Sequence, residues 1–259
     1  MSFDATVPNP ARMWNYWLGG KDNFAADRVA GDRVVAALPS MPKIARLARR
    51  FLVDAVYQLV TVYNVRQFLD VGSGLPTADN THEVAQRAAP DSRIVYVDHD
   101  PVVLNHAHAL LKSTPEGKTD YVQADLRDTA RIRAEAARTL DFSRPIAVLL
   151  IGVLHFIPDA EDPYAILSRL MDCLPSGSYL VIGHGALDIE PAAAGQMMAR
   201  YNERSPVKIR LRTREEVAPF FDGLQPVGRG LVRLDSWWDT EEADTASGLA
   251  GYVGIAMKP

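Results

Sequence analysis

The sequence predicts an α/β fold in which a mostly parallel sheet of seven strands carries helices on both faces. From residue 66 onward, short apolar runs typical of buried strands alternate with amphipathic segments of helical length. Such alternation indicates βαβ units with parallel strands. The expected strands lie near 66–71, 93–98, 119–123, 145–151, 178–184, 226–234 and 251–257. The expected helices between them lie near 78–89, 101–112, 128–138, 162–173 and 213–222.

The composition of the chain predicts one globular domain in a reducing compartment. The 259 residues are 47% hydrophobic and 23% charged, and the single cysteine, Cys173, excludes an intramolecular disulfide. A net charge of −4 argues against an obligate nucleic-acid binder. The N-terminus has no signal-peptide pattern, and the longest apolar run, 146–157, is too short to span a bilayer. We therefore expect a cytoplasmic protein without a membrane partner.

The first part of the chain, residues 1–65, is expected to form a helical cap that belongs to the same domain as the core at 66–259. Met13, Trp14, Trp17 and Leu18 recur at helical spacing, and the pair Gly19–Gly20 predicts the helix end. This helix either packs its aromatic side chains on the core or holds the polar segment that follows it over a ligand as a lid.

Residues 25–63 also read as helical, with a break predicted at 38–42 by two prolines. Their apolar side chains form one stripe. Arg46, Arg49 and Arg50 fall largely off this stripe, so a solvated basic face is the expected arrangement.

A glycine turn and three acids mark the expected binding edge. The first strand ends in Asp70 and runs into Gly72 and Gly74, a pattern typical of a tight turn or of close ligand approach. Asp98 follows 28 residues after Asp70, and Asp125 a further 27 residues on, each at the end of an expected strand. The carboxyl ends of parallel strands meet at one sheet edge, where ligands bind.

The positions of these acids favour an adenosine-containing ligand. Asp98 can accept hydrogen bonds from ribose hydroxyls and Asp125 from an adenine amino group, while His99 and Leu126 can flank the ring. Each acid could instead cap the next helix, and Asp100 before Pro101 is the strongest candidate for a cap.

The turn favours S-adenosylmethionine over a dinucleotide. A dinucleotide site normally has a third glycine, where this chain has Thr77 after Pro76. Asp70 would repel a pyrophosphate, whereas it would attract the ammonium group of S-adenosylmethionine, directly or through water.

Four ordered motifs resemble those of class I S-adenosylmethionine-dependent methyltransferases. They are Asp-Val-Gly-Ser-Gly from Asp70, Val-Asp-His-Asp-Pro from Val97, Gln-Ala-Asp-Leu from Gln123, and Gly-Val-Leu-His-Phe-Ile-Pro from Gly152. The opening segment 11–28 is similar to that of the actinobacterial "S-adenosyl methyltransferase" family, formerly a domain of unknown function, and the resemblance covers nearly the whole chain.

This resemblance implies a Rossmann-like fold and S-adenosylmethionine as cofactor. It implies that Gly72 and Gly74 lie along the methionine part and Asp70 near its amino group. Asp98 would bind the ribose, and His99, at a position where an aliphatic residue is more usual, would pack on the adenine with Asp125 and Leu126. A lid role for Tyr16, Lys21 and Asn23 follows only from how distinctive their segment is.

The acceptor side is less defined by the sequence. His155 could be a general base or could only anchor the loop after the fourth strand, and no catalytic residue is otherwise assigned. No metal site is predicted, since His82, His106 and His108 lack ligand spacing. An insertion near 185–212 interrupts the alternation, and insertions there commonly shape the acceptor pocket. Its last part alternates Lys208, Arg210 and Arg212, which are interpreted as a solvated strand edge or as a grip on an anionic acceptor.

Together these features predict an S-adenosylmethionine-dependent methyltransferase acting on a small-molecule acceptor. Two alternatives remain at this point: a non-catalytic S-adenosylmethionine-binding protein, and an NAD-dependent oxidoreductase. Nucleic-acid modification is disfavoured by the net charge and by the lack of a basic–aromatic stretch. The sequence does not define the acceptor or the oligomeric state.

Overall fold

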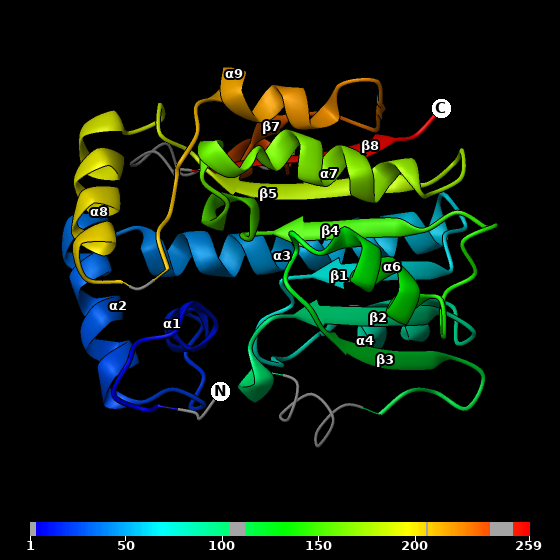
Figure 1. Cartoon of the computed structure of the whole chain (residues 1–259), viewed down its shortest axis with the longest axis horizontal. Helices are drawn as coiled ribbons and strands as arrows, with labels where there is room; N and C mark the ends of the chain where they lie inside the picture. The colour runs from blue at the N-terminus through cyan, green and yellow to red at the C-terminus, as the bar shows by residue number, and fades with distance from the viewer. Residues whose placement is uncertain (1–3, 104–111, 206, 239–250) are drawn as a thin grey trace.

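The structure is a computed structural model that describes residues 4–103, 112–205, 207–238 and 251–259. A central sheet lies between two layers of helices, with α6 and α7 on one face and α3 on the other (Figure 1). Helices α1, α2 and α8 gather beyond the end of the sheet to which the parallel strands point (Figure 1). His106, His108 and most of the helix expected at 101–112 lie outside the described residues.

The sheet has eight strands in the order β3-β2-β1-β4-β5-β8-β6, with β7 also paired to β8. The first five strands of this order are parallel, and β8 runs antiparallel to β5, β6 and β7. The strands are β1 Gln67–Val71, β2 Arg93–Asp98, β3 Lys118–Gln123, β4 Ala147–Ile151, β5 Tyr179–Gly185, β6 Gln225–Pro226, β7 Val232–Arg233 and β8 Gly251–Met257.

The α/β class and the mostly parallel sheet are confirmed, but the expected number of seven strands is wrong. The single strand expected at 226–234 is divided into β6 and β7. Between them, Gly228 and Gly230 have φ angles of 60° and 63°. Such angles are incompatible with extended backbone, so the chain turns between the two short strands, and each pairs separately with β8.

The order of the parallel strands reverses between β1 and β4. From β1 the chain adds β2 and β3 on one side, and it then returns to add β4 and β5 on the other. The loops that follow β1 and β4 therefore leave in opposite directions, which opens a crevice at their carboxyl ends. Both strands are almost entirely buried, so this edge is rigidly supported.

The helices follow the local signals of the sequence. A capping box between Thr213 and Glu216 begins α9. The helix ends at Val217, and Pro219 lies in the turn that follows, because proline disrupts the interior of an α-helix. No described helix combines the length and the apolar character needed to cross a membrane. The helices are α1 Pro10–Trp17, α2 Ala25–Ala37, α3 Met41–Thr61, α4 Thr81–Ala88, α6 Thr129–Ala136, α7 Pro163–Asp172, α8 Pro191–Arg204 and α9 Arg214–Val217.

Helix α1 is fixed beside the end of β2 by its N-cap. The Asn9 side chain accepts hydrogen bonds from the first turn of α1 and donates to Asp100 Oδ2 over 2.5 Å. Arg12 of α1 forms a buried ion pair with Asp27 of α2 at 2.9 Å. Asp100 also caps the following helix, as expected, by accepting from Val102 N at 2.8 Å. The division into a cap at 1–65 and a core at 66–259 stays a prediction.

Candidate functional site

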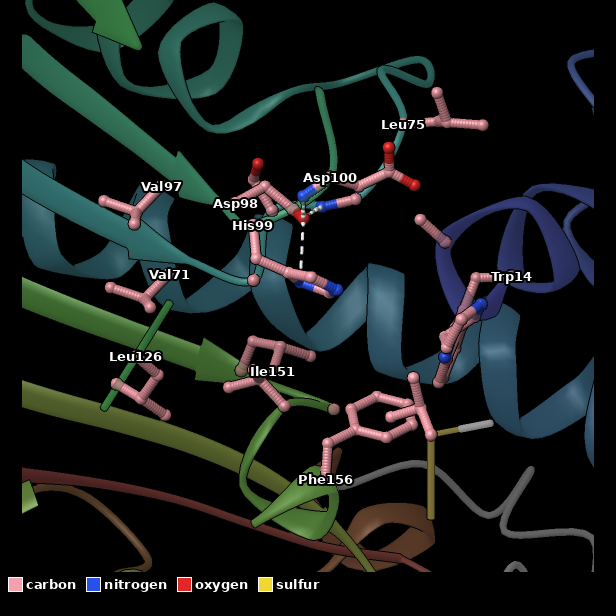
Figure 2. A pocket seen from close by; sticks show the side chains of 18 of the residues that line it. Trp14, Val71, Leu75, Val97, Asp98, His99, Asp100, Leu126, Ile151 and Phe156 are labelled. Carbon is pink, nitrogen blue, oxygen red and sulfur yellow. Dashed lines mark hydrogen bonds and ion pairs between the residues drawn. The ribbon is translucent and has the colours of Figure 1, made fainter. Parts of the chain in front are cut away.

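A cavity of about 520 Å³ occupies the crevice where the strand order reverses. Its walls come from the loops after β1, β2, β3 and β4, and α1 and α3 close it from the side. Figure 2 shows Asp98 and His99 on one side of this space and Trp14 with Phe156 on another. A volume of this size is typical of sites for small molecules and cofactors.

Seven of the nine residues expected to bind the cofactor line this cavity, and two do not. The seven come from three different strand ends, so the fold brings together what the sequence separates. Tyr16 lies outside the lining and donates to Asp32 Oδ1 at 2.7 Å. Asn23 also lies outside it. The seven lining residues are Asp70, Gly72, Gly74, Asp98, His99, Asp125 and Leu126.

The turn after β1 requires glycine for two reasons. Gly72 has a φ angle of 74°, a conformation that side chains disfavour. A Cβ atom on Gly72 would also lie 2.6 Å from Val153 Cγ2, which is a clash. Around Gly74 no heavy atom would approach such a Cβ within 4 Å, so the backbone there faces open space. The turn thus presents bare backbone to the cavity.

Asp98 holds this turn in place and is itself buried. Its Oδ2 accepts a hydrogen bond from Gly74 N at 3.0 Å, and its Oδ1 accepts from Asp100 N at 3.0 Å. Burial raises the pKa of Asp98, and the two backbone hydrogen bonds and the nearby His99 offset part of that rise. A carboxylate that the fold keeps buried at a cavity wall is typical of a binding role.

The end of β3 is more exposed to solvent. Asp125 is exposed and pairs with Arg127 at 3.1 Å, and Arg127 also pairs with Glu161. Leu126 is buried and faces the cavity between these charged groups and the sheet. The side chain of His99 is 59% exposed and lies 3.5 Å from Asp98 Oδ1, so its ring is free to cover a ligand.

Asp70 is as deeply buried as Asp98. Thr81 donates to its Oδ2 at 2.6 Å. Burial raises the pKa of Asp70 to about 6, although the Thr81 hydrogen bond and the positive charge of Arg49 oppose this rise. Asp70 is therefore ionised at pH 7 at a cost in stability, which a bound cation would reduce.

We expect replacement of Asp70 by asparagine to stabilise the protein without ligand at neutral pH. Because the pKa of Asp70 is higher in the folded chain than its ordinary value of 3.8, the stability it contributes is complete below pH 4 and is lost as the pH rises through about 6. The shift of about two units corresponds to about 3 kcal/mol.

Urea unfolding of Asp70→Asn and of the wild type at pH 4 and pH 7 should show the difference between their free energies of unfolding growing with pH. The exposed Asp222→Asn is the control, and identical pH profiles for Asp70→Asn and the wild type would contradict this assignment.

The segment proposed as a lid reaches the cavity through residues other than those expected. Trp14, Asn15 and Leu18 of the first helical segment line the cavity. Asn23 supports them indirectly, because its Nδ2 donates to Asn15 Oδ1 at 2.9 Å and to Gly20 O at 2.9 Å. A lid role for Tyr16, Lys21 and Asn23 stays a prediction.

His155 lies beside this cavity and not in its lining. It borders a second, smaller cavity next to the carboxyl end of β5. Burial, together with the nearby charge of Arg212, lowers the pKa of His155 to about 4. The imidazole is therefore neutral at pH 7, which leaves it able to accept a hydrogen bond. A catalytic role for it stays a prediction.

The three basic residues expected on a strand edge do not share one environment. Lys208 is exposed and lines the large cavity, whereas Arg210 pairs with Asp159 at 2.9 Å and Glu216 at 2.7 Å. Arg212 is fully buried. Neither a solvated edge nor a grip on an anion describes Arg212, because its charge is compensated inside the protein by Asp159 at 2.6 Å.

Arg49 is a site residue that the sequence interpretation missed. It lines the cavity near Asp70, and its Nη2 donates to the Asp79 carbonyl at 2.7 Å. Its Nε is buried and has no hydrogen-bond partner within the described chain. The helical pattern identified Arg49 only as lying off the apolar stripe, a position that can face either solvent or a cavity.

Comparison with known families and structures gives a consistent result. A family model described as "S-adenosyl methyltransferase" matches residues 1–259. The structure is similar to that of a DUF574 family protein from Streptomyces avermitilis, with 41% identity, a TM-score of 0.94 and coverage of 99% of each chain. A search of curated proteins found no match.

Two further structures extend the comparison. One is a protein of Thermobifida fusca described provisionally as a methyltransferase, with 37% identity, a TM-score of 0.88 and coverage of 98% of this chain and 96% of that chain. The plantazolicin methyltransferase BpumL, in complex with SAH, has 12% identity, a TM-score of 0.53 and coverage of 96% and 95%. At that identity the likeness extends to the fold alone.

Proposed function

Because this chain belongs to the S-adenosyl methyltransferase family, we propose that it binds S-adenosylmethionine in the large cavity and transfers its methyl group to a small-molecule acceptor. The observation that carries this proposal is the meeting of Asp70, Asp98 and Asp125 around one cavity behind a bare glycine turn. When bound, S-adenosylmethionine supplies a methyl group on a sulfonium, which is a good leaving group. The relatives above that are described as methyltransferases agree with this proposal.

The residues present fit the cofactor in charge as well as in space. Asp98 would accept hydrogen bonds from the ribose hydroxyls, and Leu126 and His99 would lie beside the adenine. The methionine tail carries both an ammonium and a carboxylate. Asp70 and Arg49, which lie close enough to influence each other's pKa, offer one partner to each.

The same region fits a dinucleotide poorly. In dinucleotide sites the glycine turn opens directly into a helix whose N-terminus binds the pyrophosphate. Here α4 begins only at Thr81, and Glu83 already occupies its N-terminus by accepting from Asn80 N at 2.7 Å. Glu83 and Asp70 would both repel a pyrophosphate, which argues against the NAD-dependent alternative.

The protein itself would act mainly by positioning. Trp14 and Phe156 cover the cavity next to Gly152, where the methyl donor and the acceptor would meet, and this cover would exclude water. Holding the two reactants in line supplies a large part of the acceleration of such a transfer. We assign no proton transfer to a particular residue.

Calorimetry tests the cofactor assignment. We expect titration of the purified protein with S-adenosylmethionine and with S-adenosylhomocysteine to give saturable binding, and titration with NAD to give none. Saturable binding of NAD with no response to the other two would support the oxidoreductase instead. Formation of S-adenosylhomocysteine in the presence of acceptor extracts would separate an enzyme from a non-catalytic binder.

Replacement of Arg49 by methionine tests the partner of the cofactor carboxylate. We expect this variant to bind S-adenosylmethionine about 10- to 100-fold more weakly, since a charge-assisted hydrogen bond is lost. Decarboxylated S-adenosylmethionine, which lacks that carboxylate, should bind the variant and the wild type with similar affinity. Arg46→Met, on an exposed position of the same helix, is the matched control. An equal loss for both ligands would show that Arg49 acts on the shape of the site and not on the carboxylate.

A further inference from the structure

A second cavity of about 90 Å³ adjoins the cofactor cavity on the side of β5. The two cavities share Trp14, Gly152 and Phe156 as a common wall. Since β5 is the next strand after β4 in the sheet, this second cavity lies one strand beyond the crevice. We call it the apolar chamber and define it by Met13, Trp17, Met197, Tyr201 and Leu211, which line it together with His155 and His184.

The wall of the apolar chamber carries no charge. None of the described residues that line it is Asp, Glu, Lys or Arg. Burial lowers the pKa of His155 to about 4 and that of His184 to about 3, so both rings are neutral at pH 7. Arg212 lies behind His184 at 3.1 Å, and Asp159 compensates its charge. An ion in this chamber would lose its hydration without gaining a partner, which is costly.

One polar atom on a lining residue of the chamber has unused hydrogen-bonding capacity. His155 Nδ1 is buried and has no hydrogen-bond partner within the described chain. Burial raises the pKa of Tyr201 to about 12, and a side-chain hydrogen bond with Ser205 partly offsets this rise, so the Tyr201 hydroxyl stays neutral. Both ring nitrogens of His184, in contrast, have hydrogen-bond partners. Nδ1 pairs with Gly185 O at 2.8 Å, and Nε2 pairs with Arg212. Buried polar atoms without partners are rare and require an explanation, and a bound polar group would provide one.

The junction of the two cavities is narrow and lies beside His155. A Cβ atom on Gly152 would lie 3.3 Å from the Trp14 ring and 3.7 Å from His155 Cε1, so both rings flank this glycine. The chamber is smaller than the ~150 Å³ apolar cavity that accepts benzene. It therefore suits a branched chain of about four carbon atoms better than an aromatic ring.

We propose that the apolar chamber binds the methyl acceptor, and that this acceptor is an uncharged molecule with a hydroxyl group and a small branched aliphatic end. The aliphatic end fills the space beside Met197, and the hydroxyl lies at the junction, where His155 is its hydrogen-bonding partner. This proposal rests on the proposed function, because it places the acceptor next to the cofactor cavity.

The test uses 2-methyl-1-propanol as the probe, with isobutyrate and isobutylammonium as charged probes of similar size. Each is added to the protein saturated with S-adenosylhomocysteine, and binding is followed by saturation-transfer NMR. We expect the alcohol to bind at least ~10-fold more tightly than either ion, since neither charge has a partner in the chamber. Failure of the alcohol to bind, or equal binding of an ion, would overturn the proposal.

Two variants of α8 locate the binding. Met197→Trp fills the chamber and should weaken binding of the alcohol at least ~10-fold, because its apolar end loses its space. Met198→Trp, at the neighbouring position outside the chamber lining, should leave it unchanged. Unchanged binding in folded Met197→Trp would also overturn the proposal, and if that variant does not fold, the comparison of the three probes on the wild type still decides. Failure of S-adenosylhomocysteine itself to bind would overturn the proposed function and this inference together.

Discussion

Replacement of Asp98 by asparagine is expected to weaken binding of S-adenosylhomocysteine at least ~100-fold while leaving the fold intact. In the proposed binding mode the carboxylate accepts from two ribose hydroxyls, and each charge-assisted hydrogen bond contributes about 1.5–3 kcal/mol. Asparagine keeps the size of the side chain and one oxygen that can accept from Gly74 N, but its amide nitrogen cannot accept the Asp100 N–H that now pairs with the second oxygen. The loss should therefore fall on the ligand and not on the glycine turn.

The stability of this variant distinguishes a binding role from a structural one. Since burial raises the pKa of Asp98, the charged carboxylate is held at a cost, and removal of that cost should offset the lost hydrogen bond from Asp100 N, so that asparagine leaves the free energy of unfolding nearly unchanged. Asp120→Asn, on β3 and outside the cavity lining, is the matched control. A loss of affinity below ~10-fold, or a parallel loss of stability, would contradict a ribose-binding role.

Replacement of Arg212 by alanine is expected to destabilise the protein by about 2–5 kcal/mol, because its fully buried side chain would leave a void and an unsatisfied carbonyl behind, whereas its partner Asp159 is 55% exposed and can be hydrated. The guanidinium donates to Leu154 O at 3.1 Å, to Ile157 O at 2.9 Å and to Asp159 at 2.6 Å. It also donates to His184 at 3.1 Å. Removing it leaves the Ile157 carbonyl without this donor, while Leu154 O still accepts from Ile157 N, and it opens a void between the loop after β4 and the strand β5.

Arg210→Ala provides the control for this prediction. Arg210 pairs with Asp159 and Glu216, but its side chain is 29% exposed, whereas that of Arg212 is 1% exposed. A partly exposed pair is worth about 0–1 kcal/mol. Urea unfolding at pH 7 should separate the two variants clearly. Similar losses for both would show that burial of Arg212 does not determine its contribution.

The sequence was sufficient to predict those parts of the fold and site that depend on local pattern. Apolar runs and their spacing located the parallel strands, and the acids that follow these runs had to meet at one sheet edge. For this reason the pattern alone could place Asp70, Asp98 and Asp125 together. The start of the helix expected near 213–222 was equally local, since Thr213 and Glu216 form a capping box there.

The features that were missed depend on contacts between distant segments. Arg49 and Arg212 both lie in sequences that read as solvated, and only the packing of α3 and of the insertion decides that one lines a cavity and the other is buried. Tyr16 and Asn23 belong to a distinctive segment, but distinctiveness alone does not show which side of a helix faces the ligand. Gly228 and Gly230 allow a turn, but the strand pattern around them predicts one continuous strand. The sequence therefore does not show that the chain turns between β6 and β7.

A crystal structure of the protein with S-adenosylhomocysteine would be the decisive measurement for the proposed cofactor site. We expect the ribose hydroxyls within hydrogen-bonding distance of Asp98, the adenine beside Leu126, and the methionine tail between Asp70 and Arg49. We also expect the sulfur atom to face the junction formed by Trp14 and Gly152. S-adenosylhomocysteine bound at another edge of the sheet, or bound in this cavity with its adenosine away from Asp98, would contradict the proposed binding mode.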